Sequence, residues 1–186
     1  MTTWKKPDYQ AGPVRKVALL AVDERGVVRQ IFEGQFVTQF KQHGQEAFQT
    51  VDILSLPEIK ADKETAAARL RENGADSILI VRLVDAATQT TSVRQNAERY
   101  SPMTTGIESY GWYNYYTVAY ADMSVVQHGT KQKVYLDTSL YDLQSGQRLW
   151  SAFTRTVLKD NMDRLEEVRP LVATVMTAMR ADGFVR

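Results

Sequence analysis

The chain has 186 residues, with 23 basic and 22 acidic side chains and a net charge of +1. This length favours one domain spanning residues 1–186, and the absence of clustered Lys and Arg argues against nucleic-acid binding. With no cysteine, the chain cannot form disulfides, thiolate metal sites or a cysteine nucleophile, and no apolar run reaches the roughly 18 residues that a membrane-spanning helix needs.

The N-terminal residues predict an extended segment, a strand and the start of a helix. Residues 1–15 are polar and contain two prolines, which indicates an extended lead-in. The run KVALLAV, residues 16–22, is apolar and bounded by charge, which predicts a buried strand. Asp23 follows directly, so we expect it to be the N-cap of a helix.

The predicted helix follows Asp23 and ends at Gly44. Its apolar residues recur mostly at spacings of three and four, which gives one apolar stripe. The residues of this stripe are Val28, Ile31, Phe32, Phe36 and Phe40. Glu33 lies off the stripe, four residues after Arg29, so we expect these two side chains to pair on the helix surface. Such a surface pair contributes only about 0.2–0.5 kcal/mol.

Two more strands and a helix complete a βαβαβ order. A strand is expected within residues 47–54, ended by Pro57, and an Ala-rich helix within residues 62–73. The sequence SILIVRLV, residues 77–84, is almost continuously apolar, which is typical of a central strand covered on both faces.

Residues 95–130 show no clear period and are expected to form an irregular, Tyr-rich excursion. Within them, YGWYNYYTVAY contains six aromatic residues: Tyr110, Trp112, Tyr113, Tyr115, Tyr116 and Tyr120. Alternate residues of a strand point to opposite faces, so one face cannot bury all six. We therefore expect an extended stretch, bent at Gly111 or Asn114, with partly buried tyrosines. These six residues are the predicted partner-binding site, because Tyr and Trp are enriched at protein–protein hot spots. Tyrosines that simply shield the sheet, or that contact a membrane or a glycan, are the alternatives.

The C-terminal part predicts a β-hairpin and a final helix. Residues 133–143 alternate between two faces and residues 148–158 return as the partner strand, with a turn at which Gly146 has a positive φ. An apolar helical stripe then runs through residues 162–179. Its sheet-facing residues are expected to include Leu171, Val175 and Met179. The predicted fold class is thus α/β, with a mixed sheet, an N-terminal βαβαβ part, a late antiparallel hairpin and a C-terminal helix packed on the sheet.

No motif predicts catalysis, a metal or a cofactor. GxSxG, GxxxxGK[ST] and GxGxxG are all absent. The only histidines, His43 and His128, lie in different segments, whereas zinc generally needs three or four converging ligands. Asp23 and Glu24 follow the first strand, where open α/β sheets often bind ligands, but capping is the commoner role there. Arg82 interrupts the central strand, and we expect it to form a structural ion pair because an unpaired buried charge is strongly unfavourable.

Several segments resemble a known family. They are TTWKKPDY, KVALLAV with the helix after it, RENGADSILIVRLV, the Tyr/Gly-rich middle, and YDLQSGQRLWSAFTRTVL before a last helix ending in DGFV. Over nearly its whole length the chain resembles bacterial envelope lipoproteins of the DUF4136-like group. The resemblance implies a small periplasmic α/β domain, similar to domains of the Tol-system translocation protein and of outer-membrane lipoproteins that activate peptidoglycan synthases. That family has no established activity, so the resemblance transfers no functional residue.

The expected function is therefore that of a non-enzymatic cell-envelope domain. The resemblance implies a periplasmic protein anchored to the outer membrane by a lipid on a cysteine ahead of Thr2, which this sequence does not contain. We expect it to bind another envelope protein, to bind no nucleic acid, and to reach the membrane through that anchor alone. The alternative is a small-molecule or glycan-binding protein that uses the Tyr-rich loop. A deep pocket with convergent polar groups would favour this alternative.

Overall fold

The computed structural model describes residues 1–10, 12–85, 111–123, 133–157 and 165–186. The strands are β1 (Thr2–Lys5), β2 (Lys16–Val22), β3 (Glu46–Gln49), β4 (Ser77–Asp85), β5 (Lys133–Asp142) and β6 (Arg148–Val157). The helices are α1 (Gly26–Gln42), the short 3-10 helix η1 (Thr50–Asp52), α2 (Leu56–Ala61), α3 (Lys63–Glu72), α5 (Trp112–Met123) and α6 (Leu165–Ala181).

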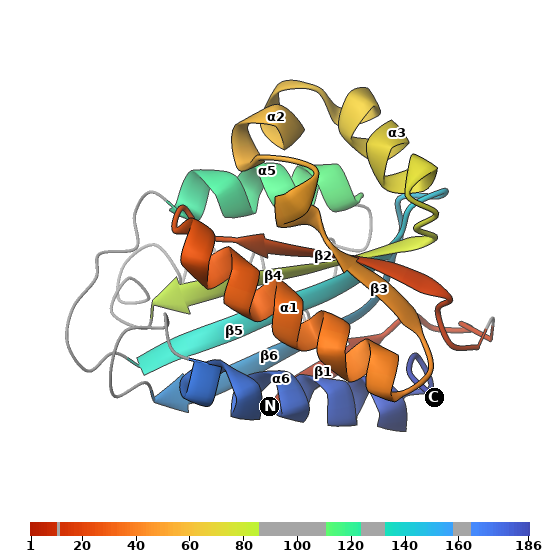
Figure 1. The fold of residues 1–186 in the computed structure, drawn as a ribbon. Coiled ribbons are helices and arrows are strands. Elements are labelled where there is room, and N and C mark those ends of the chain that lie inside the picture. The colour runs from red at the N-terminus through yellow and green to blue at the C-terminus, as the bar shows by residue number, and fades with distance from the viewer. Residues whose placement is uncertain (11, 86–110, 124–132, 158–164) are drawn as a thin grey trace.

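The strands form one mixed sheet in the order β1-β6-β5-β4-β2-β3 (Figure 1). β2 pairs in parallel with both β3 and β4, and all other neighbours are antiparallel. The α/β class with a mixed sheet is therefore confirmed. So is the prediction that β2 and β4 are neighbouring strands in the middle of the sheet.

Helices cover both faces of the sheet, and this explains why β2 and β4 are apolar without alternation. One face packs against α1 and α6, and the other packs against α2, α3 and α5. In β2, Val17, Leu19 and Ala21 belong to the first core. Ala18, Leu20 and Val22 belong to the second. A strand buried on both faces needs apolar residues at every position.

The predicted hairpin and last helix are also confirmed. β5 and β6 pair antiparallel, and Gly146 in the turn has a φ of +72°. Leu171, Val175 and Met179 of α6 are buried in the core that α6 shares with α1 and the sheet. In Figure 1, α1 crosses in front of the sheet and α6 runs along its lower side.

In the N-terminal half, one prediction is refined and two are wrong. The lead-in is extended at residues 2–5, where it forms an edge strand, β1, which pairs with β6. The strand expected within residues 47–54 is the shorter β3, and Pro57 lies in the first turn of α2 instead of ending a strand. Asp23 does not cap α1, because the N-cap of this helix is Arg25. The carboxylate of Asp23 instead accepts hydrogen bonds from the backbone and the side chain of Arg25.

The largest correction concerns the Tyr-rich stretch. Residues 112–123 form the helix α5, so the extended conformation predicted for them is wrong. The rest of the excursion at residues 95–130 lies outside the described residues.

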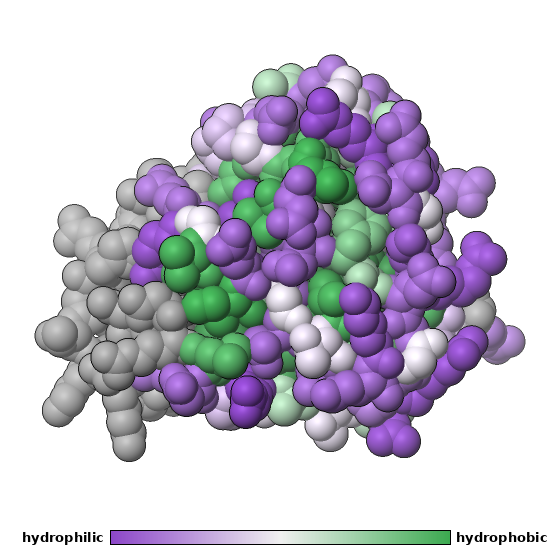
Figure 2. Space-filling model, in the orientation of Figure 1, coloured by the Kyte–Doolittle hydropathy of each residue, from purple (hydrophilic) through white to green (hydrophobic). Residues whose placement is uncertain are grey.

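None of the helices in the described part of the chain combines the length and the apolar character required to cross a bilayer. Figure 2 shows hydrophobic surface on the viewed face beside the N-terminal half of α1 and also higher up, towards α2.

Candidate functional site

α5 places its aromatic side chains on two sides. Trp112, Tyr115 and Tyr116 are buried, at the helical spacing that turns one stripe toward the sheet. Tyr113 and Tyr120 pack against the same core but stay partly exposed. Tyr110 lies outside the described residues. The structure thus brings five of the six predicted site residues together on one helix.

The tyrosine hydroxyls tie α5 to α2. Tyr113 donates a hydrogen bond to the carbonyl oxygen of Lys60 at 2.7 Å, and Tyr116 donates one to the carbonyl oxygen of Leu56. The ammonium group of Lys60 lies 4.6 Å from the centre of the Tyr120 ring, within the range of a cation–π interaction. The partly exposed rings of Tyr113 and Tyr120 are therefore held in fixed positions.

Burial also determines the protonation state of these hydroxyls. It raises the pKa of Tyr115 well above its ordinary value, and it raises the pKa of Tyr116 as well. Both phenols stay neutral at physiological pH. The neutral Tyr116 hydroxyl is the one that donates to the carbonyl oxygen of Leu56.

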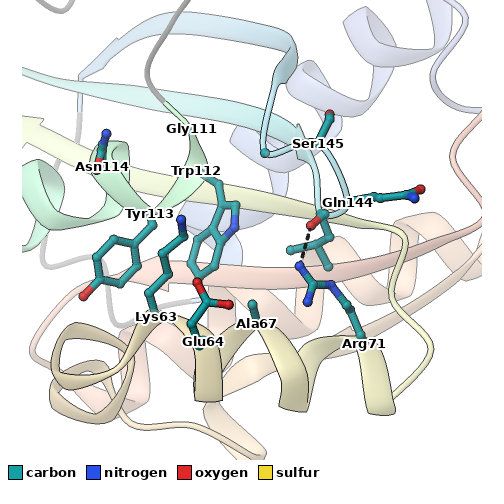
Figure 3. A pocket seen from close by; sticks show the side chains of 12 residues that line it. Lys63, Glu64, Ala67, Arg71, Gly111, Trp112, Tyr113, Asn114, Gln144 and Ser145 are labelled. Atoms are coloured by element: carbon teal, nitrogen blue, oxygen red, sulfur yellow. Dashed lines mark hydrogen bonds between the residues drawn. The ribbon is translucent and has the colours of Figure 1, made fainter.

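A pocket of about 240 Å³ lies at the N-terminal end of α5, between this helix, α3 and the β5–β6 turn (Figure 3). Its lining residues are Lys63, Glu64, Ala67, Arg71, Gly111, Trp112, Tyr113, Asn114, Leu143, Gln144, Ser145 and Gly146. In Figure 3, Trp112 points from α5 toward α3, and Asn114 points away from α3.

Close backbone contact fixes the walls of this pocket. The backbone N–H of Trp112 donates to the carbonyl oxygen of Gly146 at 3.2 Å, which joins α5 to the turn. A Cβ atom on Gly111 would lie 3.3 Å from the same oxygen, so this approach favours a residue without a side chain. Arg71 of α3 donates to the carbonyl oxygen of Leu143 at 3.1 Å. Three elements far apart in the sequence are thus locked around one small space.

The lining of the pocket is polar and carries charges of both signs. Lys63 and Arg71 supply positive charge, Glu64 supplies negative charge, and Gln144 and Ser145 supply neutral donors and acceptors. In the part of the chain that the structure describes, no group of three or more His, Cys, Asp or Glu side chains could hold a metal ion.

The two predicted ion pairs turn out differently. Arg82 pairs with Asp137 of β5 at 3.0 Å and both are buried, so the predicted structural pair is confirmed. Arg29 and Glu33 pair at 3.2 Å, but their side chains are only 6% and 1% exposed. The prediction of a surface pair is therefore wrong.

The buried Glu33 carboxylate joins α1 to two other elements. It accepts backbone hydrogen bonds from Ala21 in β2 at 3.0 Å and from Val51 in η1 at 2.8 Å. Arg29 also contacts Thr50 and lies 3.5 Å from the carbonyl oxygen of Leu54. These contacts satisfy the polar groups where β2 ends, at the place where open α/β sheets often bind ligands. In this chain the position is filled by a structural network.

Comparisons with known proteins place the chain among similar folds without assigning it to a family. No family model matches the chain, and no curated protein matches it. Membership of the DUF4136-like group is therefore not supported by those two comparisons. The chain forms an α/β domain with helices on both faces of its sheet, and α5 carries partly exposed aromatic rings and borders a small pocket. Solved structures of bacterial proteins resemble it in fold.

Three of these solved structures illustrate the similarity. They are the PelC L103M dodecamer and the PelC dodecamer from Paraburkholderia phytofirmans, and the lipoprotein GNA1162 from Neisseria meningitidis. Sequence identities are 13%, 12% and 12%, and TM-scores are 0.47, 0.48 and 0.41. The alignments cover 95%, 95% and 90% of this chain, and 97%, 93% and 97% of the other chains. The chain is thus similar over most of its length to structures that include a lipoprotein. At these TM-scores the similarity carries no argument about what it binds.

Proposed function

We propose that this chain is a non-enzymatic domain of the bacterial cell envelope that binds another envelope protein through the outer surface of α5. The observation that supports this is the pair of partly exposed rings, Tyr113 and Tyr120, held against α2 by a hydrogen bond and by Lys60. Tyrosines fixed in this way lose little conformational freedom on binding, and they are frequent at protein–protein hot spots.

The test of this surface is site-specific photocrosslinking in cells of the source bacterium. A photoreactive residue replaces Asn114, which is exposed on α5 beside Tyr113; the matched control replaces Ala173, which is exposed on α6. We expect a discrete crosslinked product from position 114 and none of the same size from position 173. Asn114→Arg should abolish a complex that Ala173→Arg leaves intact. Equal products from both positions would contradict the proposal.

The proposed location rests on the family resemblance of the sequence. We propose that the natural precursor is exported to the periplasm and anchored to the outer membrane by a lipid attached ahead of Thr2. Labelling cells with palmitate tests this, because the full-length gene product should carry the label and should sediment with outer membranes. A product without label that fractionates with cytosolic proteins would refute the anchor.

A second candidate function is the binding of a small polar molecule, such as an oligosaccharide, in the pocket at the N-terminal end of α5. The specific observation in its favour is that aromatic, charged and amide side chains meet there around about 240 Å³. Titration with soluble oligosaccharides should then shift NMR signals of Trp112 and Ser145, and Lys63→Ala should weaken the effect. Signals that do not respond in the wild-type protein would exclude this function.

A further inference from the structure

Polar side chains gather on the sheet face that α5 covers, at the centre of β5 and β6. Register places Ser139 of β5 opposite Ser151 of β6, and Ser151 opposite Trp4 of β1. The neighbouring pair on this face is Tyr141 and Arg148. Side chains directly opposite each other in a sheet lie on the same face and in contact distance. Two small serines are therefore flanked by three large side chains.

Several of these groups are buried without a hydrogen-bond partner. The hydroxyls of Tyr141 and Ser151 and the Nε of Arg148 are buried and unpartnered. The Tyr115 hydroxyl, contributed by α5, is another; its ring centre lies 5.7 Å from that of Tyr141. Burial raises the pKa of the Tyr141 hydroxyl, and the neighbouring Ser139 offsets only part of that rise without reaching hydrogen-bond geometry. Because buried polar groups are nearly always hydrogen-bonded, such a concentration calls for a partner from outside the chain, either water or a bound ligand.

Among the described residues, the charges of this region do not balance. Arg82 is compensated by Asp137 at 3.0 Å. Arg148 is only 5% exposed, and its guanidinium group lies 4.4 Å from the centre of the Trp4 ring. No ion pair or hydrogen bond among the described residues includes the Arg148 side chain. In the part of the chain that the structure describes, this one buried positive charge thus has a ring face beside it but no anion, although buried charges normally require one.

We propose that Trp4, Tyr141, Arg148 and Ser151, here called the β6 polar cluster, bind a small monocarboxylate. An arginine can donate two parallel hydrogen bonds to the two oxygens of a carboxylate, and its unpartnered Nε is available for one of them. The hydroxyls of Tyr141 and Ser151 donate to the same oxygens. Trp4 is partly exposed on the edge strand, so the cluster lies close to solvent.

The charge count selects this ligand class. A monocarboxylate neutralises the single excess charge of Arg148. A phosphate dianion would add a second negative charge close to Asp137, which already faces the same region. Bridging water would satisfy the hydroxyls but would leave the guanidinium charge uncompensated. The β6 polar cluster is separate from the exposed α5 surface, so this inference goes beyond the proposed function and does not depend on it.

The test is a titration of the full chain with sodium acetate, followed by backbone-amide NMR at constant ionic strength, with sodium chloride and inorganic phosphate as parallel probes. We expect acetate to produce saturable shifts at Tyr141, Arg148 and Ser151. Arg148→Gln should weaken acetate binding at least tenfold. Arg180→Gln, at an exposed position of α6, is the matched control and should bind acetate like the wild type.

Tyr141→Phe keeps the test decisive if Arg148→Gln does not fold. It removes a hydroxyl that has no intramolecular partner, so it should leave the stability of the free protein unchanged while weakening acetate binding several-fold. Shifts that do not saturate, that chloride reproduces, or that survive Arg148→Gln would overturn the proposal. Phosphate binding more tightly than acetate at these residues would overturn the assignment to a monocarboxylate.

Discussion

Removing the Glu33 carboxylate should be among the most destabilising single changes in this protein. Glu33→Ala leaves Arg29 as an unpaired charge in a place where its side chain is 6% exposed. It also removes the acceptor of two backbone N–H groups, those of Ala21 and Val51. We therefore expect the free energy of unfolding to fall by about 3–5 kcal/mol, the range for breaking a buried ion pair.

The size of this effect separates two descriptions of the pair. If Arg29 and Glu33 interacted on the helix surface, the loss would be only about 0.2–0.5 kcal/mol, about a tenth of the value expected from burial. Urea unfolding at 25 °C, followed by circular dichroism, resolves that difference. Glu72→Ala, at an exposed position of α3, is the control and should change stability by less than about 0.5 kcal/mol.

A double-mutant cycle identifies the partner. In wild type, Arg29→Met leaves the Glu33 carboxylate buried without its cation, but in a Glu33→Leu background the same change removes an unpaired charge. We expect a coupling energy of at least about 2 kcal/mol. A loss below about 1 kcal/mol for Glu33→Ala, or no coupling in the cycle, would refute the assignment of a buried pair.

Three further predictions concern the turn, the core and a helix cap. Gly146→Ala should destabilise the protein by about 1 kcal/mol, because φ is +72° there, whereas Gly26→Ala, with open space around its Cβ position, should cause no loss in the same unfolding assay. Leu171→Ala should lower the free energy of unfolding by about 2–5 kcal/mol; a change under 1 kcal/mol would mean that α6 does not pack as described. The Ser55 hydroxyl and backbone N–H hold the pKa of Glu58 below its ordinary value of 4.5. The ionised Glu58 carboxylate therefore stabilises the fold above pH 4.5, and this stabilisation is lost as the pH falls through the pKa of the folded state. Ser55→Ala should therefore raise the pKa of Glu58 in an NMR titration, and an unchanged pKa would disprove the cap.

The elements that could be predicted from sequence are those with a single dominant signal. β2 and β4 are continuously apolar because both of their faces are covered, and the helical stripe of α6 keeps its period through most of the helix. β1 gave no such signal, since four mostly exposed residues at a sheet edge need neither alternation nor apolar character. The position of β1 depends on its pairing with β6, and no pattern within residues 2–5 can predict that pairing.

The sequence predicts an extended stretch where α5 lies, because tyrosine and tryptophan favour strands when considered one residue at a time. The helical spacing was nevertheless present, since Trp112, Tyr115, Tyr116 and Ala119 are the buried residues and lie three, four and seven positions along the helix. A strand points alternate residues to opposite faces and so cannot bury all these aromatic rings on one side. A helix can, because residues three and four positions apart lie on the same face.

Two polar patterns in the sequence indicate the local structure better than the apolar pattern does. Ser55 and Glu58 form a capping box, whose S-x-x-E spacing marks the start of α2 better than Pro57 marks the end of a strand. Arg29 and Glu33 continue the spacing of Phe36 and Phe40 along α1, so they lie on its buried side. The β6 polar cluster could not be predicted, because only the sheet register brings Trp4 next to Arg148 and Ser151.

The pairing of β1 with β6 also determines the order in which the sheet can assemble. Thr2 lies opposite Phe153, so the first strand to be synthesised cannot take its place until almost the whole chain is available. β2, β3 and β4 come from residues 16–85 and can form their parallel pairs among themselves, whereas pairing between distant residues is slow. The edge strand can therefore dock only after β6 is available. Until it docks, the outer edge of β6 is free to pair with a strand from another chain.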